Sequence, residues 1–170
     1  QNEYEWAVKK AVYDMSHVRW DFAGDFMYDG KEKEVVLTGL PAGVTAVYEN
    51  NKAVNAGIYT ATASLSYDTV NYEKPADITP CVWEIEKAVI DPAGLEWSEY
   101  DKFVYDGQPK TVRILNLPSD AVVEYDGASE TPAGKYLARA AFVGNYKASG
   151  QVEYEWEITK ASYDMGVARW

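Results

Sequence analysis

The stretch Trp83-Glu-Ile-Glu-Lys-Ala-Val-Ile-Asp-Pro92 decides the fold, because close versions of it begin at two other tryptophans, Trp6 and Trp156. In each version a second tryptophan follows 14 residues later, since 20−6, 97−83 and 170−156 all equal 14. Composition alone does not produce one interval three times. We therefore interpret the stretch as the boundary of a tandem repeat and call it the seam. Its six tryptophans are Trp6, Trp20, Trp83, Trp97, Trp156 and Trp170.

The composition favours β-structure with an acidic surface. Tyrosine (14) and tryptophan (6) are abundant, and aromatic side chains favour strands. The formal net charge of −11 argues against binding to nucleic acid, whose phosphates require basic partners, and against charge-driven adhesion to anionic membranes. A hydrophobic content of 47% is too high for a disordered acidic tail. The sequence has no run of about 18 apolar residues, so we expect no membrane-spanning segment.

Each repeat contains the same ordered series of turn and strand signals. An Asp-Gly turn follows the second tryptophan, at Tyr28-Asp29-Gly30 and again at Tyr105-Asp106-Gly107, and this dipeptide favours hairpins. A strand stopped by proline comes next, then a shorter strand, then Ala-Gly-x-Tyr at Ala56–Tyr59 and Ala133–Tyr136. Alternating small or apolar and polar residues follow each tyrosine, as in an antiparallel strand with one face in water.

The register of these signals predicts two tandem domains between two partial ones. We expect the repeats at 9–86 and 87–160, residues 1–8 to be the end of a preceding repeat, and 161–170 to be the start of a following one. The predicted fold class is all-β, with two small antiparallel β-sandwiches of the Ig-like kind. The Gly-x-Tyr sequences at Gly57-Ile-Tyr59 and Gly134-Lys-Tyr136 are typical of a tyrosine corner, in which the hydroxyl group bonds back to nearby backbone. A β-grasp-like unit is the alternative, and it requires a helix near residues 15–22.

The ordered motifs Tyr-Asp-Gly, Leu-Pro, Ala-Gly-x-Tyr-x-Ala, Asn-Tyr and Trp-x-Ile-x-Lys-Ala resemble the tandem bacterial Ig-like repeats, of MBG or YDG type, in Gram-positive surface proteins. The resemblance extends over essentially the whole chain. It implies an exported protein, wall-associated or secreted, that is built of many such repeats. The chain departs from its own pattern at Asp91-Pro92, which replaces Tyr-Asp-Met, and at Cys81, which replaces a tyrosine.

Two roles are open for the aromatic residues. The regular spacing favours a structural role for the seam residues Trp6, Trp83 and Trp156, together with Tyr59, Tyr136, Gly57 and Gly134, because indoles bury large apolar areas. The second role is carbohydrate stacking. Trp20 and Trp97, which lie outside the alternating strand, and the loop-tip residues Tyr67 and Tyr72 are the candidates for such a ligand site.

No catalytic, cofactor or metal site is predicted. The acidic turn residues Asp25, Asp29, Asp101 and Asp106 lack the dense spacing of a calcium loop. His17 is not repeated in the other copies, and Cys81 is expected to be an inert buried thiol. A lysine–asparagine isopeptide bond is a separate hypothesis, with Lys10, Lys87 or Lys160 and Asn71 or Asn145 as the residues of suitable type.

The function expected from these observations is structural and not enzymatic. We expect stalk repeats of a larger bacterial cell-surface or secreted protein, such as an adhesin, with an extracellular or cell-wall location. Neighbouring repeats of the same polypeptide are the expected partners, and no nucleic acid and no membrane insertion are expected. The alternative is a module that binds host or dietary glycans, mucin or protein through exposed tryptophan and tyrosine side chains.

Overall fold

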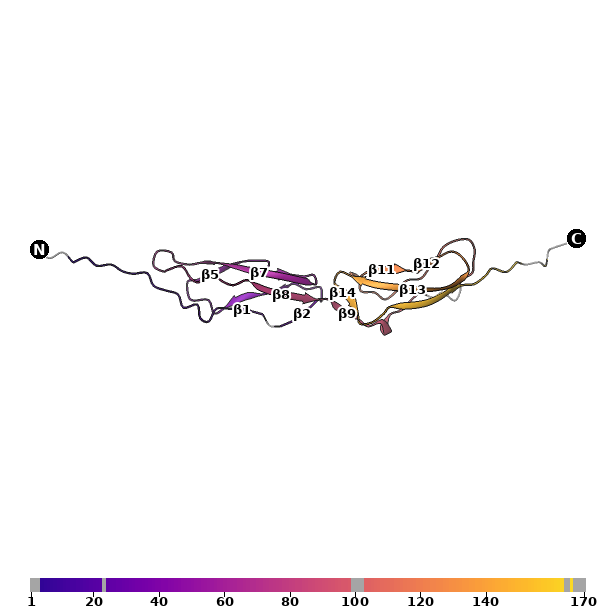
Figure 1. The fold of residues 1–170 in the computed structure, drawn as a ribbon, viewed down its shortest axis with the longest axis horizontal. Coiled ribbons are helices and arrows are strands. Elements are labelled where there is room, and N and C mark those ends of the chain that lie inside the picture. The colour runs from indigo at the N-terminus through magenta and orange to yellow at the C-terminus, as the bar shows by residue number, and fades with distance from the viewer. Residues whose placement is uncertain (1–3, 23, 99–102, 164–165, 167–170) are drawn as a thin grey trace. The chain divides into compact units, whose positions relative to one another are not determined.

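A computed structural model describes residues 4–22, 24–98, 103–163 and 166. The chain forms two compact units, Gln1–Glu86 and Lys87–Trp170, called unit 1 and unit 2 below. The described part is all-β, and a short 3-10 turn, η1 (Pro92–Gly94), is its only helical element (Figure 1). The seam residue Trp170 and the acidic residue Asp101 lie outside the described residues.

Unit 1 is built around a four-stranded sheet with the order β2-β8-β7-β5. Two pairs of short strands, β1 with β4 and β3 with β6, complete the unit. Proline at position 41 and the Asp-Gly turn lie between strands, as the sequence predicts. The strands are β1 (Arg19–Asp21), β2 (Phe26–Met27), β3 (Lys33–Glu34), β4 (Val36–Thr38), β5 (Thr45–Glu49), β6 (Lys52–Ala53), β7 (Gly57–Ser66) and β8 (Cys81–Glu86).

Unit 2 repeats this plan around the three-stranded sheet β11-β13-β15. Strands β10 and β12 pair with each other, and β14 pairs with β9. Isolated bridges join Trp97 to Ile114 and Val104 to Thr159, at positions where unit 1 forms short strands. The strands are β9 (Ala88–Ile90), β10 (Lys110–Thr111), β11 (Val122–Asp126), β12 (Ser129–Glu130), β13 (Gly134–Val143), β14 (Tyr146–Ala148) and β15 (Glu153–Ile158).

The core of each unit packs against the inward face of its long central strand, β7 in unit 1 and β13 in unit 2. Period-2 alternation along β7 and β13 turns alanine inward at the most enclosed point, where Ala61 and Ala138 are both 0% exposed. Small side chains there leave room for the seam tryptophans of the neighbouring strand, Trp83 and Trp156, which are 1% and 2% exposed. The alternation in sequence therefore places the indoles of β8 and β15 in the core.

A hydrogen bond from each buried indole holds a turn against the core. The indole Nε1–H of Trp83 donates to the carbonyl oxygen of Asn50 (3.2 Å), and that of Trp156 donates to Gly127 (3.0 Å). Both acceptors have left-handed backbone, with φ of 54° at Asn50 and 64° at Gly127. Asparagine and glycine are the residues that tolerate this conformation best, so the polar loop sequence matches the turn that the indole requires.

The tyrosine corners form as the sequence predicts. The hydroxyl group of Tyr59 donates to the carbonyl oxygen of Asn55, and that of Tyr136 donates to Pro132, both at 2.7 Å. Each ring folds back over the glycine two residues earlier, so that a Cβ added at Gly134 lies 3.2 Å from the Tyr136 hydroxyl oxygen. The glycine of Ala-Gly-x-Tyr is therefore needed because the folded-back tyrosine ring leaves little room for a side chain at that position.

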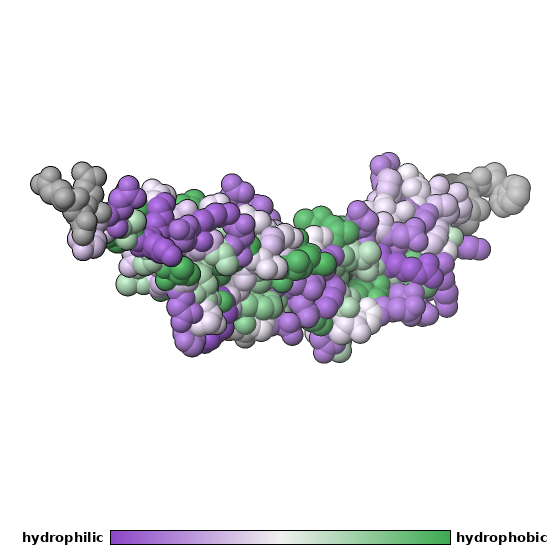
Figure 2. Space-filling view, turned by 60° about the vertical axis from the view of Figure 1, so that its left-hand side comes forward, coloured by the Kyte–Doolittle hydropathy of each residue, from purple (hydrophilic) through white to green (hydrophobic). Residues whose placement is uncertain are grey.

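The outer faces of the two sheets differ although the inner faces match. In unit 1 the outer face exposes Val47 (65%), Ile58 (71%) and Val82 (65%), whereas acidic and basic side chains of β13 and β15 line the same face of unit 2. Figure 2 shows hydrophobic residues between the hydrophilic ones on the face that it displays. The exposed face is therefore the part of the repeat that varies, as expected where packing imposes no constraint.

Three sequence-based expectations need correction or a sharper statement. The sheets are not purely antiparallel, because β2 pairs with β8 and β9 pairs with β14 in parallel. Within residues 15–22 a turn and strand β1 replace the helix that a β-grasp unit requires. Tyr4, Trp6 and Val8, which alternate like β8 and β15, form no strand and are each 84% exposed. Without a neighbouring strand in hydrogen-bonding position, alternation alone does not form a sheet.

Candidate functional site

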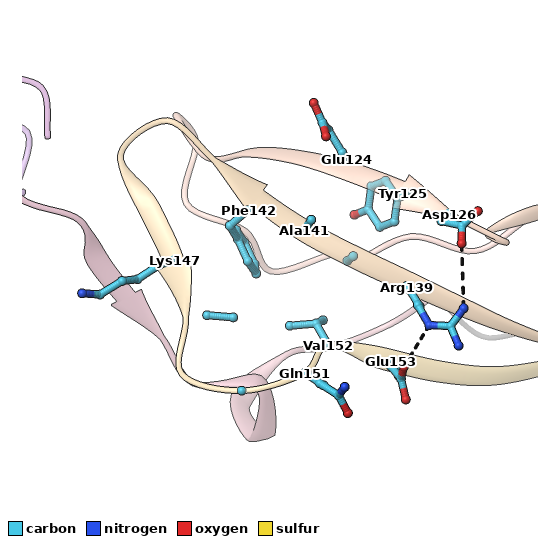
Figure 3. A pocket seen from close by; sticks show the side chains of 13 residues that line it. Glu124, Tyr125, Asp126, Arg139, Ala141, Phe142, Lys147, Gln151, Val152 and Glu153 are labelled. Atoms are coloured by element: carbon cyan, nitrogen blue, oxygen red, sulfur yellow. Dashed lines mark hydrogen bonds and ion pairs between the residues drawn. The ribbon is translucent and has the colours of Figure 1, made fainter. Parts of the chain in front are cut away.

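A groove of about 600 Å³ lies on unit 2, beside the second half of β13 (Figure 3). One side is formed by β11, and the other by residues 147–153, which include the end of β14, its connection to β15 and the first residue of β15. The groove exists because β13 extends beyond the end of its pairing with β15, at Arg139 and Glu153. The residues that precede β15 belong instead to β14, which pairs with β9.

Aromatic and aliphatic side chains line the floor of this groove, and polar groups line its margin. Val152 is buried, Phe142 is half-buried, and Tyr125 is 38% exposed. The Tyr125 hydroxyl accepts the backbone N–H of Ile114 at 3.1 Å, which fixes the ring in place. An apolar floor with a few placed polar groups is the usual composition of sites for small ligands.

Arg139 lies between two carboxylates at one end of the groove. Its Nε–H donates to Glu153 Oε1 (3.0 Å), and its Nη1 lies 3.8 Å from Asp126 Oδ2 (Figure 3). The side chains are 55%, 36% and 84% exposed, in the order Arg139, Glu153 and Asp126, so water screens these ion pairs. Both carboxylates therefore face the same guanidinium group at this end of the groove.

Unit 1 has a smaller groove at the corresponding place. It measures about 280 Å³ and lies along Ala63–Leu65, the equivalent of Ala140–Phe142, with Tyr67 and Ile78 among its other lining residues. The connection that follows β7 is longer than the one that follows β13, and it lies over this part of the strand. The groove position is therefore a property of the repeat, whereas its size depends on the length of one loop.

The structure does not bring the four predicted ligand residues together. Tyr72 stacks on Tyr13, with ring centroids 4.1 Å apart and planes 14° apart, and Tyr67 packs its edge against the same ring at 6.2 Å. Tyr13 is 9% exposed, so Tyr67 and Tyr72 hold the first residues of unit 1 onto a loop. Both rings therefore contact the ring of Tyr13.

Trp20 and Trp97 are half-buried, as expected for the less enclosed tryptophans, but they pack differently. Trp20 lies 5.8 Å from the ring of Tyr48, and its indole N–H donates to the carbonyl oxygen of Thr79 at 2.9 Å. Trp97 stacks on Tyr154, with a centroid distance of 5.0 Å and an interplanar angle of 5°. Both indoles thus contact other residues of the same unit.

Trp97 also packs against the groove residue Tyr125, with ring centroids 6.0 Å apart and planes 74° apart. None of the four residues predicted to bind a ligand lines this groove, although Trp97 packs against one that does. Tyr125, Arg139 and Phe142 are visible in the sequence only as parts of alternating strands. No local signal shows that β13 extends past its partner.

Other candidate residues have ordinary structural partners. Lys10 donates from Nζ to the carbonyl oxygen of Thr69 (2.9 Å), and the side-chain amide of Asn71 donates to Asp68 (2.7 Å), so this lysine and asparagine bond to other groups. Within the described residues, no group of three or more His, Cys, Asp or Glu side chains could hold a metal ion, and no helix is long and apolar enough to cross a membrane.

Cys81 is only partly buried, which corrects the expectation of a buried thiol. Its side chain lies at the first position of β8, where the sheet is less enclosed than at Trp83. Burial nevertheless raises the pKa of the thiol, which disfavours the reactive thiolate.

The Asp-Gly turns use their carboxylates internally. Asp29 bonds to Lys33 Nζ at 2.7 Å, and Asp106 bonds to Lys110 Nζ at 2.6 Å. Each carboxylate also accepts the backbone N–H two residues later. The bond to lysine has the largest effect and the backbone bond the next largest, and both hold the pKa of each aspartate below the ordinary value.

No protein-family model, no curated protein and no solved structure matches this chain.

Proposed function

We propose that the chain consists of non-catalytic structural repeats of a longer bacterial cell-surface or secreted protein, such as the stalk of an adhesin. One observation carries the proposal: the same strand motif is buried twice and exposed once. Trp83 and Trp156 are 1% and 2% exposed within their sheets, whereas Trp6 is 84% exposed. A strand of this composition is stable when a sheet covers its apolar face, so we assign Tyr4–Val8 to the end of a preceding repeat.

Duplication of the internal contacts supports the same proposal. The indole bond, the tyrosine corner and the lysine-bonded Asp-Gly turn occur at matching positions in the two units. These contacts stabilise a fold, and repeating them along a chain lengthens the protein without adding chemistry. The acidic composition suits a protein that stays in solution at a surface, extracellular or attached to the cell wall.

A fusion protein tests the assignment of Tyr4–Val8. Residues 10–80 are placed directly before Tyr4, so that Tyr4 takes the position that Cys81 has after Pro80. We expect the amides of residues 4–8 to become protected from hydrogen exchange and the fluorescence of Trp6 to shift to shorter wavelength. The matched control is the same fusion with Trp6→Lys, which should leave the added repeat unfolded. Continued exposure of Trp6 in the unchanged fusion contradicts the proposal.

The groove on unit 2 favours a second candidate function, the binding of a glycan. Tyr125 and Phe142 offer ring surfaces, and Arg139, Gln151 and Glu153 offer hydrogen bonds at the margin. In this second candidate function the ligand binds in the groove. It does not bind to the residues predicted from the sequence, because each of these contacts other side chains of its own unit: Trp20, Trp97, Tyr67 and Tyr72.

Titration with a panel of neutral and acidic oligosaccharides, followed by NMR, tests this candidate. Binding in the groove should perturb the amides of residues 139–142 and 147–153. Gln151→Ala should weaken the binding, because Gln151 is an exposed residue of the groove margin. Arg113→Ala, which changes an exposed residue outside the groove, is the matched control. Perturbations that spread evenly over both units, or that are absent at millimolar sugar, contradict the candidate.

A further inference from the structure

The first strand of unit 2 is bonded in parallel to the segment that leads into its last strand. Strand β9 pairs with β14, and residues 149–152 continue β14 into β15, where the chain leaves the unit. The N–H of Ala88 donates to Asn145 (2.9 Å), and the carbonyl of Ile90 accepts from Ser149 (3.0 Å). We call this three-residue pairing of β9 with β14 the first-strand ladder.

Unit 1 has the same arrangement in a shorter form. Ala11 forms a parallel bridge with Tyr72, its N–H donates to Asn71 (2.9 Å), and its carbonyl accepts from Glu73 (2.8 Å). The stacked ring of Tyr13 on Tyr72 adds an apolar contact beside the bridge. The ladder is thus a feature of the repeat, with one bridged pair in unit 1 and three in unit 2.

The last strand is held more extensively than the first. Strand β15 pairs with β13 over six residue pairs on one edge. On the other edge the N–H of Thr159 donates to Phe103 and its carbonyl accepts from Tyr105, both at 2.9 Å. When the two ends of the unit are pulled, the first-strand ladder is therefore the smaller of the two attachments.

We infer that each unit bears tensile load through its first-strand ladder. A force on the two ends pulls β9 toward its N-terminus and pulls β14 and β15 toward their C-terminus. Because β9 and β14 are parallel, this force slides them along their common axis. The hydrogen bonds lie across the direction of sliding, so they resist together, whereas the bonds of an antiparallel hairpin opened at its end break one pair at a time.

This inference deepens the proposed function, since a stalk at a cell surface has to withstand pulling, and it rests on that function for its biological meaning. The mechanical property itself belongs to the single unit. The mechanical role of the ladder can therefore be refuted while the assignment of Tyr4–Val8 to a preceding repeat is supported, and the reverse outcome is equally distinguishable.

Single-molecule pulling of the full chain tests the inference by changing the direction of force. Pulling through the two chain ends loads both ladders along the strands, and we expect two unfolding events. Each should release about 26 nm of chain, from roughly 72 residues at about 3.6 Å per residue. The second geometry pulls unit 2 between positions 122 and 143, where β11 and β13 are paired at their ends, with cysteines introduced there and Cys81→Ala.

The second geometry should open unit 2 at a clearly lower force than the first, although the protein and its equilibrium stability are the same. Forced unfolding depends on the unfolding rate along the pulled coordinate and not on the stability alone. Equal forces in the two geometries overturn the inference. The event assigned to unit 1 should also occur at lower force than that of unit 2, because its ladder is shorter.

Two proline variants identify the ladder as the resisting element. Ala88→Pro removes the N–H that donates to Asn145, and we expect about fivefold faster unfolding of unit 2 under end-to-end load, as for the loss of one hydrogen bond. Val89→Pro is the matched control, because alternation turns the N–H of Val89 away from β14. The event of unit 1 should stay unchanged in both variants. An equal effect of the two prolines, or no effect of either, overturns the assignment.

Discussion

Substitution of Gly127 by alanine should destabilise unit 2 by about 2–3 kcal/mol. A left-handed backbone conformation costs a residue with a Cβ about 1–2 kcal/mol, and the weakening of one hydrogen bond adds about 1 kcal/mol. Gly127 has φ of +64°, and a Cβ there lies 2.4 Å from the carbonyl oxygen of Leu137. That oxygen belongs to the backbone of β13, so the turn has to move away from the sheet. The movement weakens the 3.0 Å bond from the Trp156 indole to the Gly127 carbonyl.

Urea unfolding followed by hydrogen exchange and mass spectrometry measures this effect in each unit separately. With a urea slope of about 1–3 kcal/mol per molar, the midpoint for peptides of β13 and β15 should fall by roughly 1–2 M. Peptides of β7 and β8 report on unit 1 and should not change. Asn50→Gly is the matched control, because Asn50 has the corresponding turn position with φ of 54°, and glycine fits that conformation. An unchanged midpoint for unit 2 in Gly127→Ala would refute the reasoning.

Three further predictions concern the core, the corner and the acid limit of stability. Trp83→Ala should cost about 3–5 kcal/mol because it empties a buried site, whereas Trp6→Ala should change the unfolding free energy by less than about 0.5 kcal/mol, both measured by urea titration. Tyr136→Phe should cost about 1 kcal/mol through loss of the 2.7 Å corner bond, with an unchanged crystal structure or NMR spectrum elsewhere. Because the pKa values of Asp29 and Asp106 are lowered from 3.8, their contribution to stability is complete above that pH and is lost as the pH falls through the lower folded values. The Tm measured as a function of pH should therefore decline on the acid side, and this decline should be smaller in the double variant Asp29→Asn, Asp106→Asn.

The local parts of the fold follow from the sequence. Alternation places Trp83 and Trp156 inside, Gly-x-Tyr predicts the corner at Tyr59 and Tyr136, and Asp-Gly predicts the two turns. These features depend on residues within a few positions of one another. Period-2 alternation fixes which face a side chain occupies, because it follows from the geometry of a single strand.

The partners of each strand and the candidate site depend on the tertiary structure. Trp20 and Trp97 have the same place in the repeat, yet one bonds to Thr79 and the other stacks on Tyr154, where unit 1 has Cys81 instead of a tyrosine. The groove beside Phe142 is a consequence of the fold, since it forms where β13 extends past its partner.

The repeat, the strand faces and the short-range bonds can therefore be predicted from the residues alone. The parallel pairing of β9 with β14, the size of the groove and the exposure of Trp6 depend on which segments meet in the folded chain. The physical reason is that hydrogen-bonding partners in a sheet come from distant parts of the chain, and no local pattern specifies which backbone edge will be within reach. The seam motif shows this directly: the same residues are buried where a sheet receives them and exposed where none does.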